Sequence, residues 1–116
     1  MGYRSTIILG VPPKQKKEFE KICRKHYTTN EIGQKVDWET FKLVKEDKDV
    51  LIYEGEYLKW YSAFDDVKDV TEFLEDTYKK DEENCFCVGI GEDGVIHSEI
   101  GEYYDFVGVY TTHEIY

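Results

Sequence analysis

Arg4 is one of two arginines in the chain, and it stands directly ahead of a run of β-branched and apolar residues, "STIILGV". A guanidinium is a planar, permanently charged fork whose geometry matches phosphate oxygens. Because the formal net charge of the chain is −10, an anionic ligand would need such an anchored cation. The alternative is a salt bridge within the molecule to one of the 25 acidic residues. Residue type alone leaves both roles open.

Tyrosine and tryptophan side chains cluster in two segments, "YEGEYLKWYS" and "GEYYDF". If the first segment continues as one strand, Tyr57, Lys59 and Tyr61 share a face and Trp60 lies on the other. A face of rings and a lysine offers stacking for a nucleobase, worth roughly 1–3 kcal/mol per base. The alternative, which composition favours, is that the rings fill the core and a subunit interface.

A glycine motif and the cysteines favour structural roles. The sequence from Gly89 to Gly94 fits G-x-G-x-x-G, but the strand-like "VIHSEI" follows where a dinucleotide site needs a helix, so we expect a hairpin turn. Cys23, Cys85 and Cys87 lack the C-x-x-C spacing of a zinc site, and we predict that they are buried thiols.

The histidines do not complete a catalytic set. We expect His26, on the apolar face of a helix, to be a hydrogen-bonded core imidazole. His97 and Glu99 share one face of a predicted strand, as a general base and its partner would. No serine or cysteine beside them looks activated, so we predict a protein that is not an enzyme, with no catalytic residue, no metal ligand and no cofactor.

Length, composition and charge narrow the class of protein. With 116 residues, 41% of them apolar, we predict a single domain over residues 1–116. No apolar run approaches the ~20 residues of a membrane span. The first residues fit the M-G-x-x-x-[ST] lipidation pattern, but we expect the run after Arg4 to be buried strand and predict no anchor. An odd number of cysteines favours a reducing, cytoplasmic compartment.

The charges are segregated along the chain. Residues 1–30 hold seven basic and two acidic residues, whereas residues 81–116 hold nine acidic and no basic ones. This distribution argues against binding polymeric nucleic acid, which needs a broad basic surface. Two explanations of the segregated charge remain open: it keeps the protein soluble, or it attracts the basic part of one copy to the acidic part of a neighbouring copy. With the excess of tyrosine, it predicts a homo-oligomer, a tetramer or a dimer.

The hydrophobic pattern predicts an α+β fold, a two-layer sandwich of a mostly antiparallel sheet and two helices in the order β-α-β-β-α-β-β-β. The first strand covers residues 3–11, and Pro12–Pro13 precede a helix to about Tyr27. The second helix follows a capping box formed by Ser62 and Asp65. A hairpin turns at residues 92–94, and "YDFVGVYTTHEIY" is expected to be one last strand.

Four short motifs together resemble a family of small phage proteins, the anti-CBASS sponge proteins: "MGYRS", "YLKWY", the acidic "FDDVKDVTEFL" and "VGIGED". The resemblance spans most of the chain. It implies an oligomer that binds and sequesters cyclic dinucleotide signals, such as 3′,3′-cyclic GMP–AMP, without cleaving them. It implies that Arg4 contacts ligand phosphate, in the cytoplasm of an infected bacterium.

The residues that match these motifs, or that carry rings nearby, form the predicted ligand site: Tyr3, Arg4, Ser5, Lys59, Trp60, Tyr61, Tyr103 and Tyr104. The strong acidity of the chain departs from a simple anion-binding protein. The competing hypothesis is therefore an acidic phage protein that inhibits a host protein by direct binding or by mimicking DNA.

Overall fold

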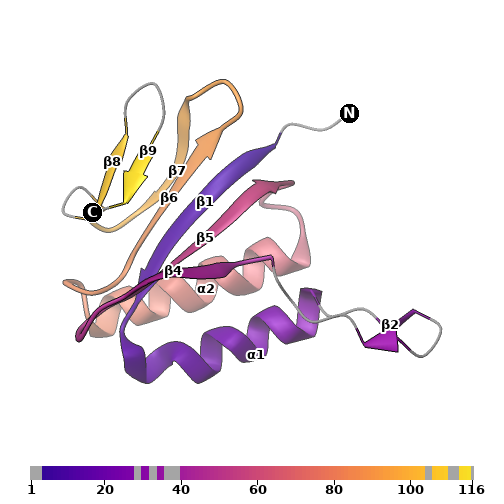
Figure 1. Ribbon diagram of the computed structural model, residues 1–116, viewed down its shortest axis with the longest axis horizontal. Coiled ribbons are helices and arrows are strands. Elements are labelled where there is room, and N and C mark those ends of the chain that lie inside the picture. The colour runs from indigo at the N-terminus through magenta and orange to yellow at the C-terminus, as the bar shows by residue number, and fades with distance from the viewer. Residues whose placement is uncertain are drawn as a thin grey trace.

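The computed structural model describes residues 4–27, 30–31, 34–35, 40–103, 106–109 and 113–115 (Figure 1). The helical elements are a 3₁₀ turn η1 (Pro13–Gln15), α1 (Lys16–Tyr27) and α2 (Asp65–Lys80). The strands are β1 (Ser5–Val11), β2 (Asn30–Glu31), β3 (Gln34–Lys35), β4 (Lys42–Glu46), β5 (Leu51–Leu58), β6 (Phe86–Gly91), β7 (Ile96–Ile100), β8 (Val107–Val109) and β9 (His113–Ile115).

Five of these strands form the main sheet, in the order β4-β5-β1-β6-β7, and all of its neighbouring strands are antiparallel. β1 lies at the centre and pairs with β5 on one side and β6 on the other. The predicted α+β sandwich of two helices and a mostly antiparallel sheet is confirmed. Two short two-stranded ladders, β2-β3 and β8-β9, stand outside the main sheet.

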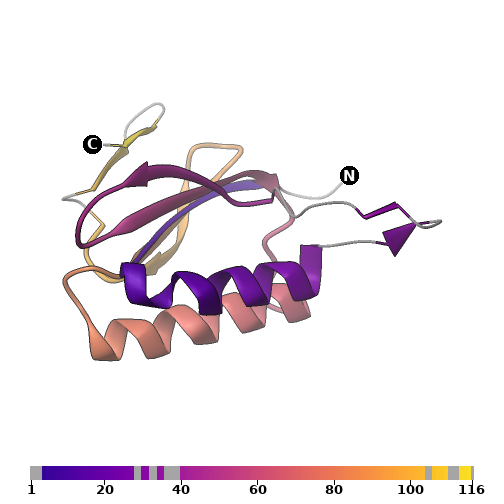
Figure 2. The same cartoon turned by 60° about the horizontal axis from the view of Figure 1, so that its bottom comes forward.

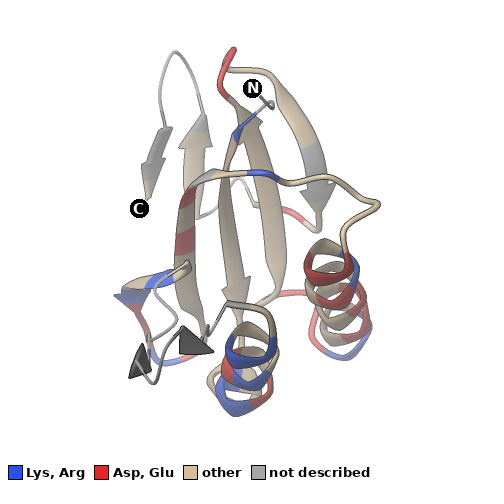
Figure 3. Ribbon diagram, turned by 90° about the vertical axis from the view of Figure 1, so that its right-hand side faces the viewer, with Lys and Arg blue, Asp and Glu red and all other residues tan. Residues whose placement is uncertain are grey.

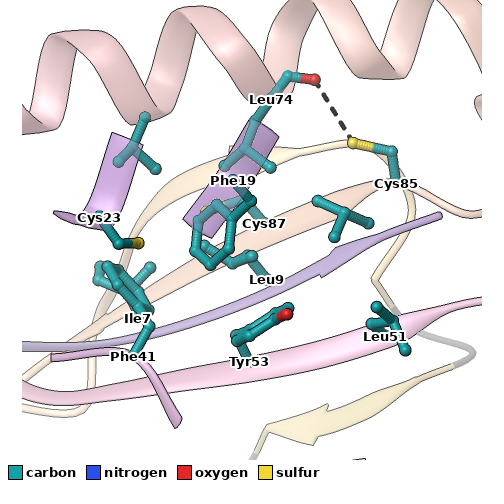
Figure 4. Close-up of a cluster of buried hydrophobic side chains, with 12 residues drawn as sticks. Ile7, Leu9, Phe19, Cys23, Phe41, Leu51, Tyr53, Leu74, Cys85 and Cys87 are labelled. Atoms are coloured by element: carbon teal, nitrogen blue, oxygen red, sulfur yellow. Dashed lines mark hydrogen bonds between the residues drawn. The ribbon is translucent and has the colours of Figure 1, made fainter. Parts of the chain in front are cut away.

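Both helices pack side by side against one face of the sheet (Figure 2). Alternate residues of β1 point into this layer, where Ile7, Leu9 and Val11 are fully buried. Phe19 of α1 lies at its centre, with its ring 4.7 Å from Tyr53 and 5.6 Å from Phe41 (Figure 4). The predicted apolar stripe of α2 is confirmed, since Val67, Val70 and Leu74 are buried and Phe73 and Tyr78 pack against the same core.

The opposite face of the sheet is also covered. Ile8, Ile52 and Val88 form a second buried cluster with Tyr103 and Val107 from the C-terminal segment. Phe86 of β6 stacks on Phe106, with ring centroids 4.8 Å apart and planes inclined by 7°. Gly10 lies opposite Phe86, and a Cβ there would overlap its ring, so any larger residue would have to displace the Phe86 side chain. The central strand is therefore buried on both faces, which matches its uninterrupted apolar sequence.

Three local expectations are wrong. The last segment is a hairpin of β8 and β9 rather than one strand. β5 ends at Leu58, so the following "KWYS" is a connection rather than strand. α2 begins at Asp65 with Phe64 as its N-cap and no side-chain cap, so Ser62 forms no capping box.

The expected hairpin turn after β6 is confirmed. Gly94 has φ of 81°, in the left-handed region that glycine adopts without strain, and the Gly94 amide donates to the Gly91 carbonyl at 2.8 Å. The chain then enters β7 rather than a helix, so the glycine motif offers no helix N-terminus for a dinucleotide. Among the described residues, no helix is both long enough and apolar enough to cross a membrane.

Candidate ligand site

A surface pocket of about 310 Å³ lies where the start of β1, the end of β5 and the start of α2 meet. Figure 3 looks onto this end of the molecule, where the connection from β5 crosses to α2. The pocket is lined by Arg4, Thr40, Leu58, Lys59, Trp60, Phe64 and Asp66. It combines two cations, two aromatic rings and one carboxylate, which is a set suited to a planar, anionic ligand.

The hairpin tip between β6 and β7 holds the backbone of Arg4 in place. The Glu92 amide donates to the Arg4 carbonyl at 2.9 Å. In return, the Arg4 amide donates to Glu92 Oε1 at 3.4 Å, a weaker contact. Because these bonds use main-chain atoms of Arg4, they fix the position of its Cα at the pocket, and the residue as a whole is half-buried.

Each of the two aromatic rings in the pocket packs edge to face against another aromatic ring. Trp60 is half-buried and meets Phe41 edge to face, with centroids 5.9 Å apart. Phe64 is 43% exposed and is held by Tyr61 in another edge-to-face contact at 5.3 Å. Each ring of the pocket therefore has an aromatic neighbour in an edge-to-face arrangement, which favours one orientation of the ring.

The end of β5 decides where Lys59 and Trp60 point. Leu58 pairs with Ser5, the first residue of β1, and among the described residues β5 has no pairing beyond this point. The chain therefore leaves the sheet and turns toward α2. The two-face alternation expected for Tyr57 to Tyr61 ends at Leu58, and both Lys59 and Trp60 line one pocket instead of opposite faces.

The structure brings together three of the eight predicted site residues, namely Arg4, Lys59 and Trp60. Ser5 and Tyr61 are chain neighbours of the pocket but do not line it. Tyr103 is 3% exposed and lies in the core on the other face of the sheet. Tyr3 and Tyr104 lie outside the described residues.

Sequence reasoning missed the other lining residues. Phe64 and Asp66 follow "LKWYS" within a few positions and were within reach of a local argument. Thr40 has no local feature that marks it, because it reaches the pocket only through the pairing of β4 with β5.

A second pocket of about 310 Å³ adjoins the first along β4 and β5. It is lined by Thr40, Lys42, Val44, Glu54, Glu56 and Leu58, so Thr40 and Leu58 belong to both pockets. The two depressions therefore form one longer groove. Its charge is mixed, since three carboxylates line it together with Arg4, Lys42 and Lys59.

Ser5 and His97 form a contact at the same end of the sheet. Ser5 Oγ and His97 Nε2 lie 2.6 Å apart. His97 is the extra residue of a β-bulge, because Gly89 pairs with Ser98 and Ile90 pairs with Ile96. Bulges re-aim side chains, which explains why His97 reaches β1 across the glycines of β6.

This contact is not the arrangement that the sequence suggested for His97. The expected partner, Glu99, has a side chain outside the described part of the chain. Ser5 is 3% exposed, so its hydroxyl is not presented to a substrate, and the contact fastens the hairpin to β1.

The cysteines are buried, as expected, and burial is the main cause that raises the pKa of each of the three thiols to about 12. The Cys85 thiol donates to the Leu74 carbonyl at 3.4 Å (Figure 4). Within the described residues, no group of three or more His, Cys, Asp or Glu side chains is placed to hold a metal ion.

His26 links the two helices. Its Nε2 donates to Asp69 Oδ2 of α2 at 2.7 Å, and Lys25 donates to the same oxygen at 3.2 Å. The hydrogen bonds from His26 and Lys25, in that order, lower the pKa of Asp69 below its ordinary value. The predicted hydrogen-bonded role of His26 is confirmed, although its partner is a carboxylate near the surface.

Comparisons with protein-family models, with curated proteins and with solved structures found no match to this chain.

Proposed function

We propose that this protein binds a cyclic dinucleotide in the groove at the start of β1 and releases it chemically unchanged. The observation that carries the proposal is the meeting of Arg4, Lys59 and Trp60 in one pocket, next to the exposed ring of Phe64. These groups come from distant parts of the sequence and supply both recognition elements that a nucleotide needs, a cation for phosphate and rings for a base.

The form of the groove supports a ligand with two bases. Each of the adjoining pockets measures about 310 Å³, at the lower end of the usual range for small-molecule sites. One nucleotide would occupy the pocket of Arg4 and Trp60, and the second would extend toward Lys42. The three carboxylates repel phosphate, so phosphate is expected beside Arg4 and Lys59, and the carboxylates suit donors on the bases.

The proposed role is sequestration rather than catalysis. We propose no nucleophile, because Ser5 is buried and the thiols are buried and protonated at neutral pH. With the resemblance to anti-CBASS sponge proteins, the proposal extends to a phage protein of immune evasion. It would act as a homo-oligomer in the cytoplasm of the infected bacterium and bind a signal such as 3′,3′-cyclic GMP–AMP.

The proposal is tested by calorimetry with a panel of cyclic dinucleotides, followed by chromatography of the recovered ligand. A charge-assisted hydrogen bond to phosphate is worth roughly 1.5–3 kcal/mol, so Arg4→Ala should weaken binding about tenfold to a hundredfold. Arg24→Ala is the matched control, because Arg24 is the other arginine and lies 61% exposed on α1, paired with Glu20.

Two results would contradict the proposal. One is binding by Arg4→Ala that equals binding by Arg24→Ala, with both variants folded. The other is recovery of linear dinucleotide or mononucleotide that increases with protein concentration and time.

A further inference from the structure

Three exposed lysines form a basic surface at the start of α1. Lys14 lies in η1, and Lys17 and Lys21 follow at spacings of three and four residues, which place them on one side of the helix. The next basic residues, Arg24 and Lys25, pair with Glu20 and Asp69. In the part of the chain that the structure describes, no ion pair involves the three lysines, which we call the lysine row.

An acidic pocket of about 500 Å³ lies at the end of α2. It is lined by Tyr78, Glu82, Glu83, Asn84, Glu102 and Phe106, with no basic residue among them. The three glutamates are exposed, and no ion pair between described residues involves them. Carboxylates beside two aromatic rings make a pocket suited to an ammonium group, because ring faces also attract cations.

The two surfaces lie at the same end of the molecule. Figures 1 and 2 show α1 beginning and α2 ending at that end, with the helices running in opposite directions. A two-fold axis beside this end would bring the lysine row of each copy to the acidic pocket of the other. In such a symmetric interface every contact occurs twice, so two complementary surfaces are enough to form it.

We infer that the chain forms a two-fold dimer in which the lysine row of one copy docks on the acidic pocket of the other. The occupant is a second copy because the same chain carries both members of the complementary pair. This interface is independent of the proposed cyclic dinucleotide groove, which lies at the opposite end of the sheet, near the end of β5.

Charge reversal tests the inference with three variants. Variant one carries Lys14→Glu and Lys17→Glu, and variant two carries Glu82→Lys and Glu83→Lys. Each variant alone should be monomeric, because like charges meet at both contacts and raise the dissociation constant roughly tenfold or more. The third variant combines all four substitutions and should dimerise like the parent, because the charges are exchanged.

The decisive experiment mixes variants one and two in equal amounts. In a two-fold dimer of one copy of each, both contacts join opposite charges, so the mixture should form dimers that neither variant forms alone. Sedimentation velocity at micromolar concentration measures the assembly, and circular dichroism checks folding. Arg24→Glu with Lys68→Glu is the control, because it changes the net charge as variant one does, at exposed positions near the end of α1 and the start of α2, and should leave the dimer intact.

The parent dimer should also weaken between 0.1 and 1 M salt, where the screening length falls from about 10 to 3 Å. A parent chain that stays monomeric at 100 mM salt and about 100 µM protein, a scale at which weak assemblies form, would overturn the inference. So would an assembly that persists in variants one and two, or a mixture of the two that stays monomeric.

Discussion

The buried hydroxyl of Tyr53 is expected to lower the free energy of unfolding. Tyr53 is 2% exposed within the core between the sheet and α1, and its hydroxyl oxygen has no hydrogen-bond partner among the described residues. Desolvation by burial is the main cause that raises the pKa of Tyr53 to about 12, so the phenol is neutral at physiological pH. A buried polar group without a partner typically costs ≈1–3 kcal/mol.

Tyr53→Phe removes that penalty and leaves a void of about one oxygen atom, on the order of 10–15 Å³, which costs roughly 0.3 kcal/mol at the usual cavity coefficient. We therefore expect the free energy of unfolding to rise by about 1 kcal/mol and the melting temperature by roughly 3–6 °C. Urea and thermal denaturation measure both. Tyr78→Phe, at a half-buried tyrosine, is the control and should change stability by less than about 0.5 kcal/mol. If Tyr53→Phe lowers stability by about 1 kcal/mol or more, the hydroxyl has a partner in solution and the reasoning fails.

Three further outcomes follow from the packing and the charges. Gly10→Ala should lower the free energy of unfolding, measured in urea titrations, by about 1–3 kcal/mol, because the Cβ of the alanine would overlap the Phe86 ring. An unchanged midpoint of the urea transition would contradict this packing. Asp69→Asn should lower the free energy of unfolding at neutral pH. The folded-state pKa of Asp69 lies below its unfolded value, so the ion pair stabilises the fold only when the carboxyl is ionised. The difference in unfolding free energy between the parent and Asp69→Asn should shrink below about pH 4, because the parent carboxyl is then protonated too. A difference that stays constant down to about pH 2 would contradict the role of charge. The three thiols should react slowly with iodoacetamide at about pH 8 in the folded protein and quickly in urea. The reactive form is the thiolate, and burial in the folded protein raises each thiol pKa to about 12. Equal rates in both conditions would show that the thiols are accessible.

The local elements could be predicted because their causes are local. The consecutive prolines after Val11 end a strand and begin a helical turn in almost any context. The apolar stripe of α2 follows from spacings of three and four residues, and Gly94 provides the backbone conformation of the hairpin turn. Burial of the cysteines likewise followed from their number and spacing.

The candidate site depended on long-range pairing. The end of β5 at Leu58 is set by Ser5, the first residue of β1, which no pattern within "YEGEYLKWYS" reveals. Because β5 ends there, Lys59 and Trp60 both line the same pocket as Arg4, whereas a continued strand would have placed them on opposite faces.

The sequence by itself determined the α+β class, the central apolar strand and the two amphipathic helices. Tertiary structure alone decided that the C-terminal hairpin covers the second face of the sheet and buries Tyr103 there. It alone carried Thr40 and Asp66 to the pocket of Arg4. The physical reason is that turns, caps and periodicity act over a few residues, whereas the end of a strand and the face that a segment covers depend on partners far along the chain.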